Sequence, residues 1–119
     1  MITLEINNII KINIINKKKG VLIMENSFYK GNRQALYDWM PEGCVLVTFS
    51  GKEVIKTADE YYAFYANRNF VYLTGLDRKE FILTAAKTKD GVKETVYIQP
   101  KDEHAERWTG RRLSKEEVK

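Results

Sequence analysis

The Asp90-Gly91 dipeptide, with the two segments that flank it, constrains the fold of this chain more than any other feature. The segments 81–86 and 94–98 are short and rich in β-branched and aromatic residues, as is typical of strands. Asp-Gly favours a tight hairpin turn, because its residues tolerate the positive φ angles that such a turn needs. The sequence therefore predicts that 81–86 and 94–98 pair as antiparallel strands.

Two further segments, 44–49 and 70–74, have the same composition and are also predicted to be strands. We expect 44–49 to be buried, because it is an apolar run bounded by turn residues. A helix is predicted before it, since Asn26 or Ser27 can cap its start and Pro41-Glu42-Gly43 ends it. The apolar face expected for this helix consists of Phe28, Leu36, Trp39 and Met40.

A capping box, Ser114-x-x-Glu117, predicts that another helix begins at the end of the chain. Helices and strands thus alternate along one domain-sized chain of 119 residues. We expect the domain to be incomplete at its C-terminal end.

One cysteine and one histidine limit the chemistry of the chain. They exclude an internal disulfide, a His/Cys zinc site and a two-histidine metalloprotease helix. We expect Cys44 to be a buried, inert thiol, and His104, in an acidic segment, to be exposed. Neighbouring acidic residues such as Asp102 and Glu103 rarely chelate together, so no metal site is expected. No apolar run reaches the roughly 20 residues of a bilayer span.

Residues 1–23 differ in composition from residues 24–119. They consist almost wholly of Ile, Asn and Lys and carry a net charge of +3, whereas residues 24–119 carry only +1. The near-neutral body argues against a nucleic-acid partner. Our hypothesis is that Met24 is the physiological start and that residues 1–23 are upstream translation or a disordered leader that packs poorly on the body. The alternative is a short strand or helix of a real domain.

Two groups of residues are open to a functional and a structural interpretation. The aromatic cluster of residues 61–72 could stack nucleic-acid bases, but packing against the sheet is the favoured interpretation. The segment 106–112, which contains Trp108, is either a tip that faces a ligand or partner, or a helix end whose tryptophan docks on the sheet.

Five stretches of the chain occur in an order that is specific, although no single stretch is. They are Arg33–Leu36 followed by Met40-Pro41, Phe49–Gly51, Ala58–Phe64, Asn67–Gly75, and Pro100–Asp102 followed by Trp108–Leu113. In this order, residues 27–119 resemble the amino-terminal domain of Xaa-Pro aminopeptidases, the aminopeptidase P members of the creatinase/prolidase superfamily. Two departures stand out: Tyr65 replaces an arginine found in many members, and residues 1–23 match nothing in the family.

The resemblance implies a cytoplasmic parent hydrolase that removes the N-terminal residue preceding proline from peptides. It places two manganese ions in a C-terminal metallopeptidase domain of the same chain, so this segment would hold no metal, have no catalytic residue and be inactive alone. The implied fold is of the α/β class: a mixed sheet with flanking helices, as in the creatinase amino-terminal domain, with a ribonuclease-H-like motif. Such a domain walls the active-site entrance and makes subunit contacts in a homo-oligomer.

Four residues are assigned roles by this resemblance. Trp108, with Arg111 and Arg112 beside it, is implied to lie close to the active site of a neighbouring subunit. Asp59 matches the acidic residue of the Ala-Asp segment, for which the resemblance implies a polar anchoring role.

Two other functions are weighed against this one. The chain could be a stand-alone binding module that uses residues 108–112. It could also be a ribonuclease-H-like nuclease, but such an enzyme needs several carboxylates converging from strand ends, and the predicted strand cores contain none.

Overall fold

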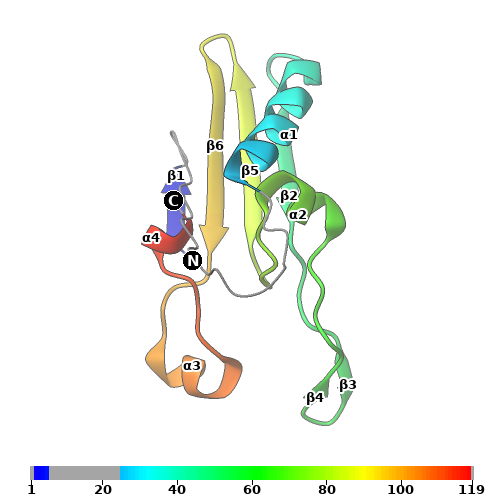
Figure 1. The fold of residues 1–119 in the computed structure, drawn as a ribbon, viewed down its shortest axis with the longest axis vertical. Coiled ribbons are helices and arrows are strands. Elements are labelled where there is room, and N and C mark those ends of the chain that lie inside the picture. The colour runs from blue at the N-terminus through cyan, green and yellow to red at the C-terminus, as the bar shows by residue number, and fades with distance from the viewer. Residues whose placement is uncertain (1, 6–24, 119) are drawn as a thin grey trace.

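The computed structural model describes residues 2–5 and 25–118 (Figure 1). Four strands form an antiparallel sheet in the order β1-β6-β5-β2, and these are β1 (Ile2–Glu5), β2 (Val45–Phe49), β5 (Ile82–Thr88) and β6 (Gly91–Ile98). A second sheet of two short strands contains β3 (Ile55–Thr57) and β4 (Glu60–Tyr61). The helices are α1 (Asn26–Trp39), α2 (Arg68–Thr74), α3 (Glu103–Thr109) and α4 (Lys115–Val118). The predicted α/β class is confirmed.

The β5–β6 hairpin is the centre of the sheet and confirms the first prediction from the sequence. Its strands pair antiparallel from Ile82↔Tyr97 to Thr88↔Gly91. The glycine lies just after the two-residue turn rather than within it, with a φ of +130° that side chains rarely allow. The dipeptide therefore marks the turn correctly, but Gly91 begins the second strand.

One face of the sheet packs against α2 and α4 and forms the main core. Its fully buried side chains come from α2, β5, β6 and α4, and they are Phe70, Leu83, Val96, Ile98 and Val118. Residues Leu83 and Ala85 of β5 alternate with more exposed ones, as the period of two in a half-buried strand requires.

Two basic side chains attach α1 to the rest of the body. The Lys87 ammonium donates to the carbonyls of Tyr37 and Met40, both at 2.7 Å, and so satisfies oxygen atoms at the end of α1. The buried Arg33 guanidinium donates to Glu94 of β6 at 3.2 Å and to the Leu73 carbonyl of α2 at 2.7 Å. Arg33 therefore links two helices and the sheet.

The apolar face predicted for α1 is wrong in part. Trp39 is 80% exposed and Phe28 is also exposed, whereas Arg33 and Tyr37 are buried. Helical spacing alone does not show which side of a helix meets the sheet, and the ion pair with Glu94 draws Arg33 to the inside.

The strand predicted at 70–74 is wrong, because these residues form α2. The Asn67 side chain accepts hydrogen bonds from the backbone N–H groups of Asn69 and Phe70, which caps the helix at its start. Gly75 ends it with a φ of +73°, and a Cβ there would lie 2.6 Å from the Tyr29 ring. These two caps and the packing of Phe70 outweigh the β propensity of the aromatic run.

The strand predicted at 44–49 exists, but its expected burial is wrong. β2 is the last strand of the sheet, and its residues alternate between exposed and half-buried. Cys44, expected to be buried, is exposed because it precedes this edge strand. An apolar run without charges predicts a strand but does not distinguish a central position from an edge.

Part of the segment expected to pack poorly on the body pairs with it. Residues 2–5 form β1, which pairs antiparallel with β6 from Ile2↔Ile98 to Glu5↔Thr95. The free edge of β6 offers backbone groups that an extended segment can pair with. The prediction for residues 6–23 lies outside the described residues. Among residues 2–5 and 25–118, none of the helices has the length and apolar character needed to cross a bilayer.

Candidate functional site

Two projections leave the same end of the sheet, where β2 and β6 end (Figure 1). One is the β3–β4 arm, residues 53–62, which carries Asp59. The other is the α3 projection, residues 99–113, which carries Trp108, Arg111 and Arg112. The structure therefore brings the four residues of interest to one end of the domain, but on two separate elements.

Local hydrogen bonds shape the α3 projection. The Asp102 carboxylate accepts from the backbone N–H groups of His104 and Ala105 at 3.0 and 3.1 Å, which caps α3. Gly110 ends the helix with a positive φ of 86°. None of the residues in α3 is buried; Trp108 is 84% exposed and His104 is exposed as predicted. Trp108 therefore does not dock on the sheet.

Arg111 and Arg112 hold the segment between α3 and α4 in place. The Arg111 guanidinium pairs with Glu117, and Arg112 donates to the Pro100 carbonyl at 2.8 Å. Glu117 also accepts from the Ser114 backbone N–H at 2.8 Å, which is one of the two hydrogen bonds of the predicted capping box. This N–H and the Arg111 guanidinium lower the pKa of Glu117 below its ordinary value. Both arginines thus already have partners within the domain.

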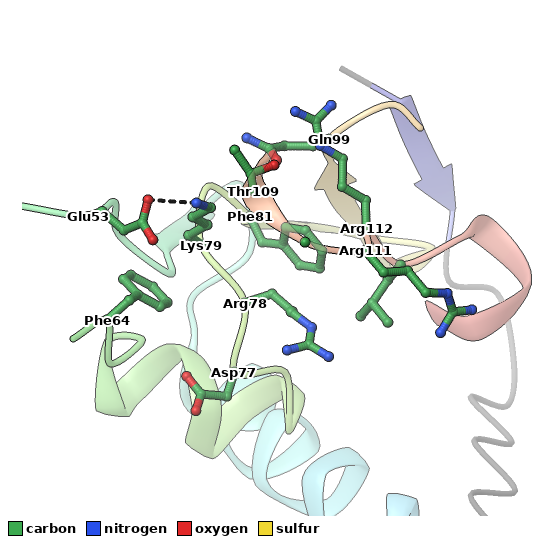
Figure 2. Close-up of a pocket in the computed structure, with 12 residues that line it drawn as sticks. Glu53, Phe64, Asp77, Arg78, Lys79, Phe81, Gln99, Thr109, Arg111 and Arg112 are labelled. Atoms are coloured by element: carbon green, nitrogen blue, oxygen red, sulfur yellow. Dashed lines mark hydrogen bonds and ion pairs between the residues drawn. The ribbon is translucent and has the colours of Figure 1, made fainter. Parts of the chain in front are cut away.

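A hollow separates the α3 projection from the loop of residues 77–81. Arg111 and Arg112 contribute to its lining together with Arg78, Lys79 and Glu53. Figure 2 shows the Lys79–Glu53 ion pair, 2.6 Å long, at one side, and the Arg111 and Arg112 side chains extending in different directions. The basic groups do not converge on one point, so the geometry does not define an anion site.

The sequence analysis missed the loop that lines this hollow. Arg78 makes no ion pair within the part of the chain that the structure describes, and Asp77 accepts a hydrogen bond from the Ala66 backbone at 3.1 Å. The signal was present, because a run of four charged residues, 77–80, begins two residues after Gly75.

Asp59 is exposed at the turn of the β3–β4 arm, next to Ala58, whose φ is +43°. It does not belong to the lining of the hollow. The role predicted for it as a polar anchor stays a prediction.

The aromatic cluster packs less than expected. Only Phe70 enters the core, while four tyrosines are exposed on the arm, before α2 and along its outer side: Tyr61, Tyr62, Tyr65 and Tyr72. The prediction that the cluster packs against the sheet is therefore wrong for these residues. A helix turns successive side chains by about 100°, so Phe70 and Tyr72 face different surroundings.

The side chains that could hold a metal ion are dispersed over the described part of the domain. Among residues 2–5 and 25–118, no three His, Cys, Asp or Glu side chains lie close enough together to hold a metal ion. The prediction that this segment holds no metal stays a prediction.

The fold and the two projections define a class: an α/β domain whose sheet packs helices on one face and presents exposed aromatic and charged residues at one end. The family described as aminopeptidase P, N-terminal domain, matches residues 29–119. The chain belongs to this family, which confirms the resemblance seen in the sequence.

Known proteins similar to the chain support this assignment. It is 32% identical over 102 residues to Xaa-Pro aminopeptidase 3 of Dictyostelium discoideum, covering 85% of this chain and 19% of that protein. It is 34% identical over 89 residues to the Xaa-Pro aminopeptidase of Escherichia coli K12, covering 74% and 20%. The chain thus spans about a fifth of the length of these relatives.

Solved structures support the same family assignment. A protein from Bacillus anthracis described as an aminopeptidase P has a TM-score of 0.77 and 35% identity over 80% of this chain and 23% of that one. Aminopeptidase P from E. coli with the inhibitor Pro-Leu has a TM-score of 0.70 and 30% identity over 76% and 21%.

Proposed function

We propose that this chain is the non-catalytic amino-terminal domain of a manganese-dependent Xaa-Pro aminopeptidase. The domain walls the entrance to an active site in a C-terminal metallopeptidase domain of the same polypeptide, and it contacts a neighbouring subunit of a homo-oligomer. The observation that carries the proposal is the family match over residues 29–119, together with relatives named Xaa-Pro aminopeptidase. A cytoplasmic location and proline-containing peptide substrates belong to the same proposal.

The α3 projection supports a role at a contact. A tryptophan that is 84% exposed gains nothing from the core of its own domain, and large aromatic side chains dominate the binding energy of interfaces. A cleft that accepts only the free amino end of a peptide needs walls that exclude other substrates. Trp108, held by the capped helix α3, is suited to such a wall.

The two tryptophans of the chain offer a matched test in the full-length parent. Trp108→Ala is expected to lower kcat/KM for longer Xaa-Pro peptides, with a loss of about 1–3 kcal/mol in transition-state stabilisation, as truncation of an interface anchor does. Trp39→Ala removes a side chain of similar exposure from α1 and should leave kcat/KM unchanged. The melting temperature should change little in both. Unchanged kinetics for Trp108→Ala would contradict the role of this residue.

A second test uses the 119-residue chain alone. We expect it to hydrolyse no Xaa-Pro peptide, with or without added manganese, because a metal-activated water needs a fixed set of several ligands. Turnover that follows the purified protein through chromatography and disappears with a chelator would contradict this expectation.

A further inference from the structure

A second hollow, called here the aromatic groove, lies between the start of α1 and α2. Its volume is about 450 Å³, within the range of sites that bind small ligands. The lining residues that matter for its chemistry are Phe28, Tyr29, Tyr65, Arg68, Val71 and Tyr72. Four of these six residues are aromatic, so the groove offers a wide apolar surface beside one basic group.

Contacts within the domain hold the walls of the groove in place. The Asn32 side chain of α1 donates to the Tyr72 carbonyl of α2 at 2.8 Å, and the two helices lie side by side (Figure 1). The Phe28 ring meets the rings of Tyr29 and Tyr72 edge to face, with centroids 5.4 and 6.2 Å apart. The Tyr29 ring packs over Gly75, where a Cβ would lie 2.6 Å from it. A ligand would therefore meet preformed walls, which lowers the entropic cost of binding.

The aromatic side chains remain open to solvent in spite of these contacts. Phe28, Tyr72 and Tyr65 are 40%, 55% and 82% exposed. The hydroxyl groups of Tyr65 and Tyr72 make no hydrogen bond within residues 2–5 and 25–118. Such a surface is suited to an extended, proline-containing peptide. The ring faces pack against its apolar side chains, and the hydroxyl groups donate to its backbone carbonyls, which form no internal hydrogen bonds.

Arg68 supplies a positive charge without a partner. Its side chain is exposed and makes no ion pair within the part of the chain that the structure describes. Asp77, which also lines the groove, accepts a hydrogen bond from the Ala66 N–H instead. A guanidinium matches a carboxylate with two parallel N–H donors, and every free peptide carries a carboxylate at its C-terminus. The charge of the groove therefore complements the end of a peptide.

The aromatic groove is continuous with the hollow beside the α3 projection, because Asp77 lines both. An aminopeptidase takes up the amino end of its substrate, so the carboxyl end is the part left outside the cleft. A peptide that enters past the α3 projection can thus extend through the hollow toward Arg68.

We propose that the aromatic groove binds the C-terminal part of a proline-containing peptide substrate of the full-length parent, with apolar residues over Tyr72 and the terminal carboxylate at Arg68. The inference rests on the proposed function in one respect, that the α3 projection borders the entrance to an aminopeptidase site.

Binding to the 119-residue chain tests the carboxylate pairing without any activity. The probe is the peptide Ser-Pro-Pro-Leu-Pro-Phe with a free C-terminal carboxylate, and the same peptide as its C-terminal amide is the control. A titration followed by the backbone amide resonances of Val71 and Tyr72 should give a dissociation constant about 3-fold lower for the acid, as one exposed ion pair allows. Equal dissociation constants, or resonances that do not move, would overturn the proposal.

Two exposed aromatic residues provide a matched test of the apolar contact in the same titration. Tyr72→Ala should raise the dissociation constant of the acid peptide by about 5-fold, as truncation of a contact residue does. Trp39→Ala removes an exposed aromatic side chain at the other end of α1 and should leave the dissociation constant unchanged. Equal effects of the two variants would contradict the proposal.

The full-length parent tests whether the groove serves catalysis. The ratio of kcat/KM for the acid peptide to that for the amide should exceed one and should approach one in Arg68→Gln. Lys89→Gln removes the same charge at the exposed β5–β6 turn and should keep the ratio of the parent. A ratio that Arg68→Gln leaves unaltered, as expected if another domain covers the groove, would overturn the proposal.

Three further outcomes separate the proposal from its alternatives. If the resonances of Val71 and Tyr72 shift with the concentration of the chain in the absence of peptide, the groove binds a second copy and the proposal is wrong. Preference for the acid in a chain whose parent lacks Xaa-Pro activity would support the groove and contradict the proposed function. An active parent whose chain shows no such preference would do the reverse.

Discussion

The body of the domain and its two projections use their apolar side chains differently. In the body, β5, β6 and α2 bury large residues such as Phe70 and Leu83 completely. In the β3–β4 arm and the α3 projection, the strands and the helix bury none of their residues, although they carry Tyr61 and Trp108. The difference indicates that the body determines the stability of the domain and that the projections are available for contacts.

The projections depend on local interactions for their shape. The arm contains an exposed ion pair between Lys56 and Glu60, 2.9 Å long, and α3 is capped by Asp102. Exposed ion pairs contribute little to stability, because water and salt screen them. The effects of substitutions on stability should therefore differ between the body and the projections, and three pairs of variants measure that difference.

The largest effect is expected in the core. Leu83→Ala should lower the free energy of unfolding by about 2–5 kcal/mol, because it removes buried methyl groups and leaves a cavity. Tyr61→Ala, on the exposed arm, should change it by less than about 0.5 kcal/mol. Urea unfolding of both variants measures the two values. Similar losses would show that the arm is part of the folded core.

A smaller effect is expected from the ion pair that links α1 to β6. Arg33→Met should cost about 2 kcal/mol, because Glu94 and the Leu73 carbonyl lose a buried donor. Lys56→Met breaks the exposed ion pair of the arm and should cost less than about 0.5 kcal/mol.

Arg33→Met leaves the Glu94 carboxylate without its ion-pair partner, and the double variant Arg33→Met, Glu94→Gln removes that charge as well. It should recover part of the loss in the free energy of unfolding. No recovery would assign the effect of Arg33 to packing of its aliphatic part rather than to the ion pair.

The smallest effect concerns pH and Glu117 of α4, which pairs with Arg111 of the α3 projection. The pKa of Glu117 lies below its ordinary value near 4.5, so its ionised form stabilises the fold above that pH. This contribution is lost as the pH falls from about 4.5 through the lower folded pKa. Urea midpoints between pH 6 and pH 3 should therefore fall less steeply for Glu117→Gln than for the parent chain. The exposed-turn variant Glu42→Gln should keep the slope of the parent, and identical slopes in all three would contradict the role of Glu117.

Several features could be predicted because their signals are local. The hairpin follows from the Asp90-Gly91 turn between two β-rich segments, and α4 follows from the Ser114 and Glu117 capping box. In both cases residues within a few positions of each other satisfy each other's backbone groups. The family could also be assigned from the sequence, because the order of the motifs can be recognised without knowledge of their contacts.

Other features depended on partners distant in the chain. Residues 70–74 have the composition of a strand, yet they form α2 because Phe70 enters the core and Arg33 from α1 binds the Leu73 carbonyl. Likewise, an uncharged apolar run predicted a strand at residues 44–49. Its place at the edge of the sheet became clear only from the structure, in which β5 is its one partner among the described strands.

The sequence by itself determined the class of the domain, its hairpin, its first and last helices and its family. The tertiary structure alone decided which apolar residues are buried, which strand lies at the edge and where the candidate residues meet. The physical reason is that backbone turns and caps are short-range interactions, whereas burial depends on which distant segments pack together. Trp39, Trp108 and Val47 are apolar in the sequence, and only the packing leaves them exposed to solvent.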